Sequence, residues 1–284
     1  MQKRPYGNTG EMLSIIGFGG IVVKDADTDE SSRLVSEAID RGINYFDVAP
    51  RYGNAQEKLG PALEPYRNDV FLACKTRERD AVNAERELHD SLKKLRTDHF
   101  DLYQMHSMTT DADVDEVLGP GGALETFVKA REQGLVRFLG FSAHSVEAAS
   151  RLLEAFEFNS VLFPLNWVNY FEGDFGPQVV DLAEQKGVAR LALKAAAKAQ
   201  LPDRNVRTHE KCWYEPIVDR DLMSLAVRFT LSQAITAAVP PGDSNLWRMM
   251  AEIGEDFTPI TKGEIETLKN EAKSNTPIFV HPVA

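Results

Sequence analysis

The feature that most constrains the fold is a regular alternation of short apolar runs with amphipathic stretches along the chain. Eight runs have the length and composition of β-strands, and turn-forming residues bound them. Between the runs, apolar residues recur at helical spacing, as Leu88, Leu92 and Leu95 do. The predicted strands cover residues 14–17, 43–48, 70–75, 101–106, 137–142, 160–165, 189–194 and 235–239.

This alternation predicts the fold class. Alternating strand and helix patterns favour parallel strands covered by helices, and eight such units favour an α/β fold of the (β/α)8 TIM-barrel type. A doubly wound open sheet is the competing fold, but the glycine-rich residues 17–20 lack the spacing of a dinucleotide-binding turn. Turn-forming residues at positions 6–10 predict an N-terminal β-hairpin. The predicted helices cover residues 31–40, 84–95, 123–132, 146–156, 178–186 and 222–232, and another begins after residue 242.

Length, charge and cysteine content bound the function. The 284 residues suit one domain, predicted over residues 1–284. A formal net charge of −11 argues against a nucleic-acid or anionic-membrane surface. The basic first residues lack the apolar stretch of a signal peptide, and no apolar run reaches the roughly 18 residues of a membrane span. Two cysteines, Cys74 and Cys212, cannot form a disulfide framework, so a cytoplasmic, reducing location is expected.

Four polar side chains lie at or just beyond the ends of early strands: Asp47, Tyr52, Lys75 and His106. In a parallel barrel such positions converge at the C-terminal mouth, where barrel enzymes keep their chemistry. An ammonium near Tyr52 is expected to lower the phenol pKa from its usual value of about 10. Each residue alone is commonly structural, but the four together at matched strand ends predict a proton-transfer site.

Later strand ends continue this pattern. Ser142 and Asn166 offer hydrogen bonds for a carboxamide, although either is also a good cap, and Lys194 ends the seventh predicted strand. After the eighth strand comes a turn that opens a helix, which is the usual phosphate site of such barrels. The other histidines, among them His144, show no metal-ligand spacing, so they are expected to be structural and no metal site is predicted.

Two predicted connections are longer than the others, residues 107–122 and residues 201–220. Long loops at the mouth of a barrel commonly cover the ligand. We therefore expect both to form walls of the site.

Several short motifs occur in a fixed order, at residues 7–10, 16–19, 46–53, 57–60, 101–106 and 140–142. With the order and spacing of Asp47, Tyr52, Lys75 and His106, they resemble the aldo-keto reductase superfamily over about residues 4–246. The resemblance implies a barrel that binds a nicotinamide cofactor, usually NADPH. It also implies hydride transfer to the carbonyl carbon of a small aldehyde or ketone.

The resemblance assigns roles to individual residues. Tyr52 would be the general acid, Lys75 and Asp47 would tune it, and His106 would orient the carbonyl. Cofactor contacts would come from Ser142 and Asn166 at the carboxamide, from Lys194 at its strand end, and from Gly242, Ser244, Asn245 and Arg248 near the phosphates.

This chain departs from the family pattern at the cofactor positions. Many members have Ser-Asn, Gln and an aromatic residue where this chain has Ser142 followed by alanine, Asn166 and Lys194. The Lys-Ser pair that many members use on the 2′-phosphate is absent. Asp243 would repel that phosphate and Arg248 would attract it, so NADP is expected by family default and NAD stays possible.

Other functions remain open from the sequence. A Schiff-base aldolase or lyase could use Lys75 or Lys194 as its nucleophile. A non-catalytic nicotinamide-binding regulatory subunit would keep the same four residues. A metal-dependent hydrolase is the weakest alternative, because paired metal ligands are missing at the strand ends. The oligomeric state stays open.

Overall fold

The computed structural model describes residues 1–203 and 205–282. Arg204, in the predicted connection 201–220, and Val283 and Ala284, at the end of the predicted domain, lie outside the described residues. The chain divides into two units, each described by itself: Phe18–Leu162, and Met1–Gly17 together with Phe163–Ala284. The single domain over residues 1–284 stays a prediction.

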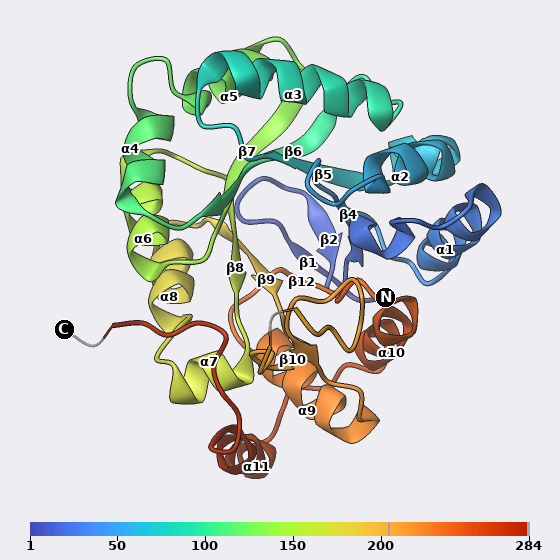
Figure 1. Ribbon diagram of the computed structural model, residues 1–284, viewed down its shortest axis with the longest axis vertical. Coiled ribbons are helices and arrows are strands. Elements are labelled where there is room, and N and C mark those ends of the chain that lie inside the picture. Colours follow the sequence, from blue (N-terminus) through green and yellow to red (C-terminus); the bar gives the residue numbers. More distant parts are fainter. Residues whose placement is uncertain (204, 283–284) are drawn as a thin grey trace. The chain divides into compact units, whose positions relative to one another are not determined.

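The unit Phe18–Leu162 contains a parallel sheet whose strands pair in chain order (Figure 1). Its central strands are buried along their whole length because helices cover the sheet. The register places Asp47 beside Ala73 and Lys75 beside Gln104. The strands are β3 (Phe18–Gly19), β4 (Tyr45–Asp47), β5 (Phe71–Thr76), β6 (Phe100–Met108), β7 (Val136–Ala143) and the start of β8 (Ser160–Pro164).

Side-chain caps begin four of the six α-helices of this unit. Asp27, Asp80 and Ser145 each accept a hydrogen bond from a backbone N–H in the first turn of the helix that follows. Helices α3 and α5 pack side by side (Figure 1). The helices are η1 (Gly20–Val23), α1 (Thr28–Asp40), α2 (Ala55–Leu63), η2 (Glu64–Asp69), α3 (Ala81–Lys94), α4 (Asp111–Leu118), α5 (Ala123–Glu132) and α6 (Val146–Ala155).

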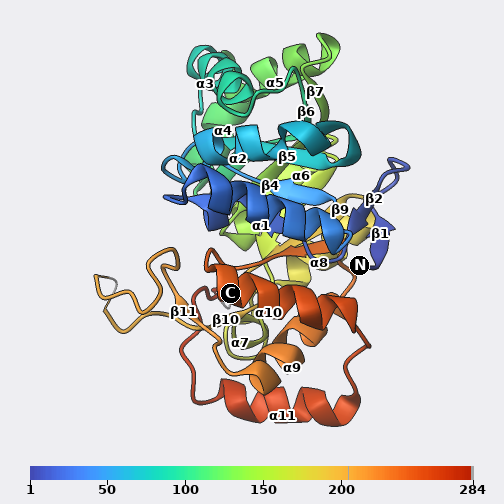
Figure 2. The ribbon, with the colours of Figure 1, turned by 90° about the vertical axis from the view of Figure 1, so that its right-hand side faces the viewer.

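The other unit begins with the predicted hairpin, which is confirmed: β1 (Lys3–Pro5) pairs antiparallel with β2 (Met12–Ser14). The end of β8 continues into this unit, where β9 (Ala189–Leu193) pairs parallel with β12 (Ala237–Val239). A short ribbon forms where β10 (Ala197–Ala199) pairs with β11 (Glu215–Pro216). Figure 2 shows the described residues of the connection between β10 and β11 projecting away from the helices of this unit.

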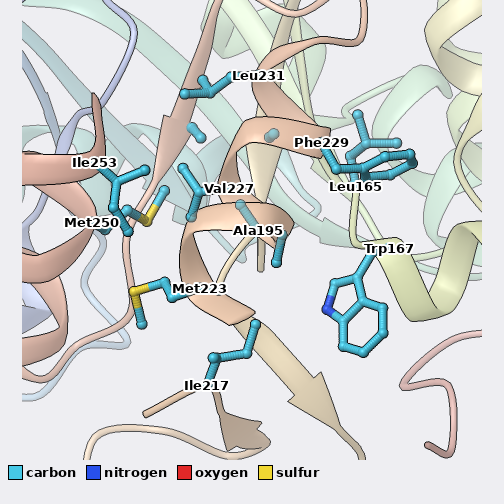
Figure 3. Close-up of a cluster of buried hydrophobic side chains, with 14 of the residues drawn as sticks. Leu165, Trp167, Ala195, Ile217, Met223, Val227, Phe229, Leu231, Met250 and Ile253 are labelled. Carbon is cyan, nitrogen blue, oxygen red and sulfur yellow. The ribbon is translucent and has the colours of Figure 1, made fainter. Parts of the chain in front are cut away.

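Helices of the second unit bury a large apolar cluster (Figure 3). Met223 and Val227 from one helix meet Met250 and Ile253 from another, and Trp167 joins them. Among the described helices, none is both long and apolar enough to cross a bilayer. The helices are α7 (Trp167–Glu172), α8 (Pro177–Gln185), α9 (Arg220–Leu231), α10 (Ser244–Glu255) and α11 (Lys262–Ala272).

The parallel strands in the described residues number eight, in the order β12-β9-β8-β7-β6-β5-β4-β3. Neighbours along the chain are neighbours in the sheet, and helices separate them, as in a (β/α)8 barrel. Ile16 adds a parallel bridge to Ala238 of β12. The predicted (β/α)8 fold class is confirmed.

The structure differs from two of the sequence predictions. The strand predicted at residues 14–17 is wrong, because its apolar run is divided between the end of β2 and the approach to β3. The long connection predicted at residues 107–122 contains helix α4. That helix begins with a capping box in which Thr110 and Asp113 bond each other's backbone N–H groups.

Candidate active site

A buried ion pair lies at the ends of β4 and β5. Lys75 Nζ donates a hydrogen bond to one oxygen of the Asp47 carboxylate, and each side chain is about 1% exposed. The second oxygen accepts from the hydroxyl of Tyr45 and from the amide of Gln104, both at 3.2 Å. Both carboxylate oxygens therefore have buried donors, which holds Asp47 in one orientation.

Tyr52 lies in the turn between β4 and α2, and this turn brings its ring to the ion pair. Its N–H donates to the carbonyl of Ala49 at 3.1 Å, which closes the turn. Lys75 Nζ lies 5.4 Å from the Tyr52 ring centroid. The His106 ring lies 5.9 Å from the Tyr52 ring, edge to face at 89°. The structure thus brings the four predicted catalytic side chains together within one unit.

Burial and charge set the protonation of these groups. Burial raises the pKa of the Tyr52 phenol, although the Lys75 charge lowers it, so the predicted net lowering is wrong. Burial would lower the pKa of Lys75, but the charge of Asp47, with Tyr52 and the hydrogen bond to Asp47, together raise that pKa. Burial, followed by the charge of Lys75, holds the pKa of His106 well below its ordinary value. At neutral pH the site therefore holds a protonated phenol, an ammonium and a neutral imidazole.

The backbone after His106 is fixed from several sides. Arg79 donates to the carbonyls of His106 and Ser107 at 3.1 and 3.2 Å, and its Nε donates to Asp113 at 2.9 Å. Ser107 has a φ of 62°, a conformation that costs on the order of 1–3 kcal/mol and needs such support. Among the described residues, the buried Nδ1 of His106 has no hydrogen-bond partner.

Ser142 connects this strand end to its neighbour. Its Oγ accepts the N–H of Ser107 at 2.8 Å, and the residue is buried. The hydroxyl can still donate its own proton, which is what a carboxamide oxygen would require. Ser142 therefore fits the predicted cofactor role in its donor chemistry.

Asn166, in the other unit, has its hydrogen-bonding capacity filled by protein. Its Oδ1 accepts from the N–H groups of Val168 and Asn169 as the N-cap of α7. Its Nδ2 donates to the carbonyls of Lys194 and Ala197 at 3.1 and 2.6 Å. A carboxamide would have to displace one of these bonds, so the geometry favours a structural role for Asn166.

Lys194 has surroundings unlike those of Lys75. Its Nζ lies 4.7 Å from the Trp213 ring centroid and 5.7 Å from that of Phe279. Burial lowers the pKa of this amine to about 7. The backbone at Lys194 has a φ of 65°.

The predicted phosphate site lies at the start of α10. Asp243 caps this helix, and its carboxylate accepts from the N–H groups of Asn245 and Leu246 at 2.9 and 3.1 Å. The backbone of Gly242 hydrogen-bonds the buried Cys212 thiol. Arg248 lies 5.8 Å from the Trp247 ring centroid. An anion at this helix terminus would meet the Asp243 carboxylate first, which opposes phosphate binding there.

Sequence reasoning missed three residues that support the site: Tyr45, Gln104 and Arg79. Tyr45 and Gln104 each lie two positions before a predicted catalytic residue on the same strand. Side chains two apart share one face of a strand, so the period of the strand could have identified both. Arg79 follows β5 in a loop, and no sequence pattern marks it. Within residues 1–203 and 205–282, no three His, Cys, Asp or Glu side chains group to hold a metal ion.

A second buried hydrogen-bond network includes Cys74, the chain neighbour of Lys75. Gln56 donates to the hydroxyl of Ser91 at 2.9 Å and to the thiol of Cys74 at 3.4 Å. Burial raises the pKa of Cys74 to about 12 and that of Cys212 to about 11. Both cysteines are free and buried, and both are thiols at neutral pH.

Comparison with known proteins matches nearly the whole chain. The model of the Aldo/keto reductase family matches residues 15–238. The uncharacterized oxidoreductase YqkF of Bacillus subtilis (strain 168) is 24% identical, covering 97% of this chain and 98% of that protein. L-galactose dehydrogenase of Arabidopsis thaliana is 23% identical, covering 100% and 95%. The holo form of the aldo-keto reductase AKR11C1 from Bacillus halodurans has a TM-score of 0.76 at 22% identity, covering 97% and 98%, and shares the fold.

Proposed function

Because this chain belongs to the aldo/keto reductase family, whose members are NAD(P)-dependent oxidoreductases, we propose that it reduces an aldehyde or ketone to an alcohol with Tyr52 as general acid. One observation carries the proposal: a buried Asp47–Lys75 ion pair lies against a phenol whose pKa burial raises. A phenol that stays protonated at neutral pH is a proton donor, and a carbonyl oxygen that gains negative charge is its natural acceptor.

The ammonium of Lys75 acts on this proton transfer through its charge. As the phenol gives up its proton, the developing phenolate is stabilised by the cation beside the ring. Asp47 keeps Lys75 protonated, and Tyr45 and Gln104 keep Asp47 oriented. The chain of contacts therefore favours the transition state more than the ground state.

His106 is suited to orienting the carbonyl oxygen as a neutral donor. Its low pKa keeps it uncharged, so it can position the oxygen without competing with Tyr52 as a proton source. The Arg79 bonds to its backbone, and the Ser142 bond to Ser107, fix the place of the ring. Arg79 and Ser142 are therefore positioning residues in this proposal.

The nicotinamide cofactor supplies the hydride when bound. Ser142 would donate to its carboxamide, and Ser244, Asn245 and Arg248, with the backbone of Gly242, would lie near its phosphates. The donor chemistry fits at Ser142, and Asp243 limits the fit at the start of α10. We propose a modest preference for NADPH over NADH, since Arg248 could attract the 2′-phosphate that Asp243 repels.

The structure disfavours Lys75 as a Schiff-base nucleophile. An imine forms from the neutral amine, but Asp47 holds the pKa of Lys75 above its ordinary value. The ion pair thus fits the charge-tuning role of Lys75 and leaves an aldolase without its nucleophile at this position.

The experiment is Tyr52→Phe, assayed with NADPH and NADH against a panel of small aldehydes and ketones. General acid catalysis is worth about 10²–10⁴-fold, so turnover should fall by that factor. Cofactor affinity, followed by fluorescence titration, should stay nearly unchanged because the phenol acts on the substrate oxygen. Turnover near that of wild type in the folded variant would overturn the assignment. A wild-type protein that binds cofactor and reduces nothing on the panel would instead indicate a regulatory subunit.

A further inference from the structure

Lys194 directly follows β9, the seventh parallel strand, and within the described residues no acidic group pairs with its buried amine. The residue is 7% exposed. Aromatic rings, Trp213 and Phe279, are the groups found near its Nζ, at 4.7 and 5.7 Å from the ring centroids. Within the described part of the chain, no carboxylate, carbonyl or hydroxyl accepts a hydrogen bond from this amine. Burial is the single cause that perturbs it.

The backbone at Lys194 is held in place. Its carbonyl accepts from the amide of Asn166 at 3.1 Å and from the N–H of Ala197 at 2.9 Å. The following residue, Ala195, is packed in the apolar cluster of the same unit (Figure 3). These contacts fix a left-handed backbone conformation that L-residues rarely adopt. The position of the amine is therefore set by the surrounding structure.

The two aromatic rings beside the amine also contact each other, edge to face at 6.0 Å between centroids. Phe279 stacks on Phe175 at 5.3 Å between centroids, and its N–H donates to Asn169 at 3.3 Å. Trp213 packs edge to face on Tyr214 at 5.6 Å between centroids and is itself 45% exposed. A small molecule would reach the amine past this exposed indole.

These surroundings make the amine nucleophilic. The faces of aromatic rings attract an ammonium, but more weakly than a carboxylate does, so they offset part of the desolvation. The pKa of Lys194 is lowered to about 7. An ordinary lysine is neutral in less than about one molecule in a thousand at pH 7. Desolvation in an apolar setting is one of the known ways to activate a lysine for attack on carbonyl carbon.

We propose that Lys194 is a reactive amine that captures small aldehydes as imines. In the first step the nitrogen bonds to the carbonyl carbon, and one of its protons passes to the carbonyl oxygen. In the second step the carbon–oxygen bond breaks, and the oxygen leaves as water with the other nitrogen proton as the C=N bond forms. Amine and aldehyde give imine and water, so the reaction needs no oxidant or reductant. The reaction does not use Tyr52.

The test is reductive trapping of the full-length protein. Acetaldehyde and cyanoborohydride at pH 7 convert each imine into an N-ethyl lysine, which peptide mass spectrometry quantifies at every lysine. Lys198 is the matched control, because it lies four residues later, is 38% exposed and is paired with Glu215 at 3.4 Å. Lys75 is the control for a buried amine that has a counter-ion.

We expect Lys194 to be labelled at least about tenfold faster than Lys198, since its neutral fraction at pH 7 is about 10³ times that of an ordinary lysine. Lys75 should be labelled most slowly. Lys194→Arg should remove this adduct and leave the labelling of Lys198 unchanged. Labelling of Lys198 as fast as that of Lys194, or no adduct at Lys194, would overturn the proposal.

Two further variants separate activation from access. Trp213→Ala opens the path to the amine and also admits water to it, so the pH at which labelling of Lys194 reaches half its maximum should rise if desolvation activates the amine. An unchanged midpoint in this variant would contradict the role of the rings. Tyr52→Phe should leave the labelling unchanged, which keeps this test apart from that of the reductase function.

Discussion

Lys75 and Lys194 are the same residue in similar places, and their surroundings give them opposite properties. Both lie at the C-terminal end of a strand of the parallel sheet, Lys75 in β5 and Lys194 directly after β9, and both are buried. Lys75 has a carboxylate partner, and its pKa is raised. Lys194 has aromatic neighbours, and its pKa falls to about 7. A counter-ion, more than the degree of burial, decides whether a buried lysine is a fixed cation or a reactive amine.

Removing the Lys75 ammonium should give the largest effect. Lys75→Met leaves the Asp47 carboxylate buried without its cation, and such a loss costs about 3–5 kcal/mol. Urea unfolding at pH 7 should show this decrease, and Lys198→Met, which breaks an exposed pair, should change the free energy by less than about 1 kcal/mol. In any folded fraction the pH profile of turnover should shift upward, since the charge that lowers the Tyr52 pKa is gone. Equal effects of the two substitutions would break the comparison.

Lys194→Met should change the free energy of unfolding in the opposite direction, by raising it. The pKa of Lys194 is about 7 in the folded protein against 10.5 ordinarily, so between these values the unfolded chain binds a proton that the folded chain does not. Wild-type stability therefore rises from pH 7 toward pH 10.5 and is lowest below pH 7. We expect methionine to stabilise the protein by roughly 2–4 kcal/mol at pH 7 and by clearly less at pH 9.5. A variant less stable than wild type at both values would contradict an uncompensated amine.

Removing a hydrogen bond to the Asp47 carboxylate should have a smaller effect. Gln104→Leu removes a donor to the carboxylate, and a hydrogen bond to a charged group is worth about 1.5–3 kcal/mol. We expect kcat to fall about tenfold with little change in KM. Gln56→Leu is the matched control, because this buried amide bonds Ser91 and Cys74 instead. If both variants keep wild-type kcat, Gln104 does not position Asp47 for catalysis.

The smallest expected effect concerns a third cation, Arg248, in the unit that also contains Lys194. Asp243→Asn keeps a cap on α10 but removes the charge that opposes a 2′-phosphate. It should improve NADPH affinity a few-fold and leave NADH nearly unchanged, as measured by fluorescence titration. Arg248→Ala should weaken NADPH selectively. Equal losses for both cofactors would show that Arg248 supports the helix and does not read the phosphate.

The sequence predicted the strands of this fold better than the helices between them. Seven of the eight predicted strands overlap strands of the parallel sheet, because each is a short apolar run bounded by turn-forming residues, whereas among the helices α5 was predicted with its observed bounds. Helices α4 and α11 were missed although both begin with a capping box, the second formed by Thr261 and Glu264. Helix α2 was also missed, because Pro61 lies inside it and proline normally argues against a helix. Local patterns therefore identify strands more directly than short surface helices.

The sequence also predicted which residues form the candidate site, but not their pKa values or their hydrogen bonds. The positions of Asp47, Tyr52, Lys75 and His106 follow from the register of parallel strands. Whether the pKa of Tyr52 rises or falls depends on the balance between its burial and the charge of Lys75. The hydrogen bonds that Asn166 makes depend on its position as the N-cap of α7. Both arise from contacts between distant segments, which no local pattern contains.

The two buried cysteines have a consequence for the protein's response to oxidants. Peroxides and electrophiles attack thiolates, and the raised pKa values of Cys74 and Cys212 leave almost no thiolate at neutral pH. The sulfur beside Lys75 is therefore poorly reactive although it adjoins the candidate site. Oxidative damage should instead begin at an exposed thioether such as Met12, on the hairpin, where methionine sulfoxide reductases can reverse it.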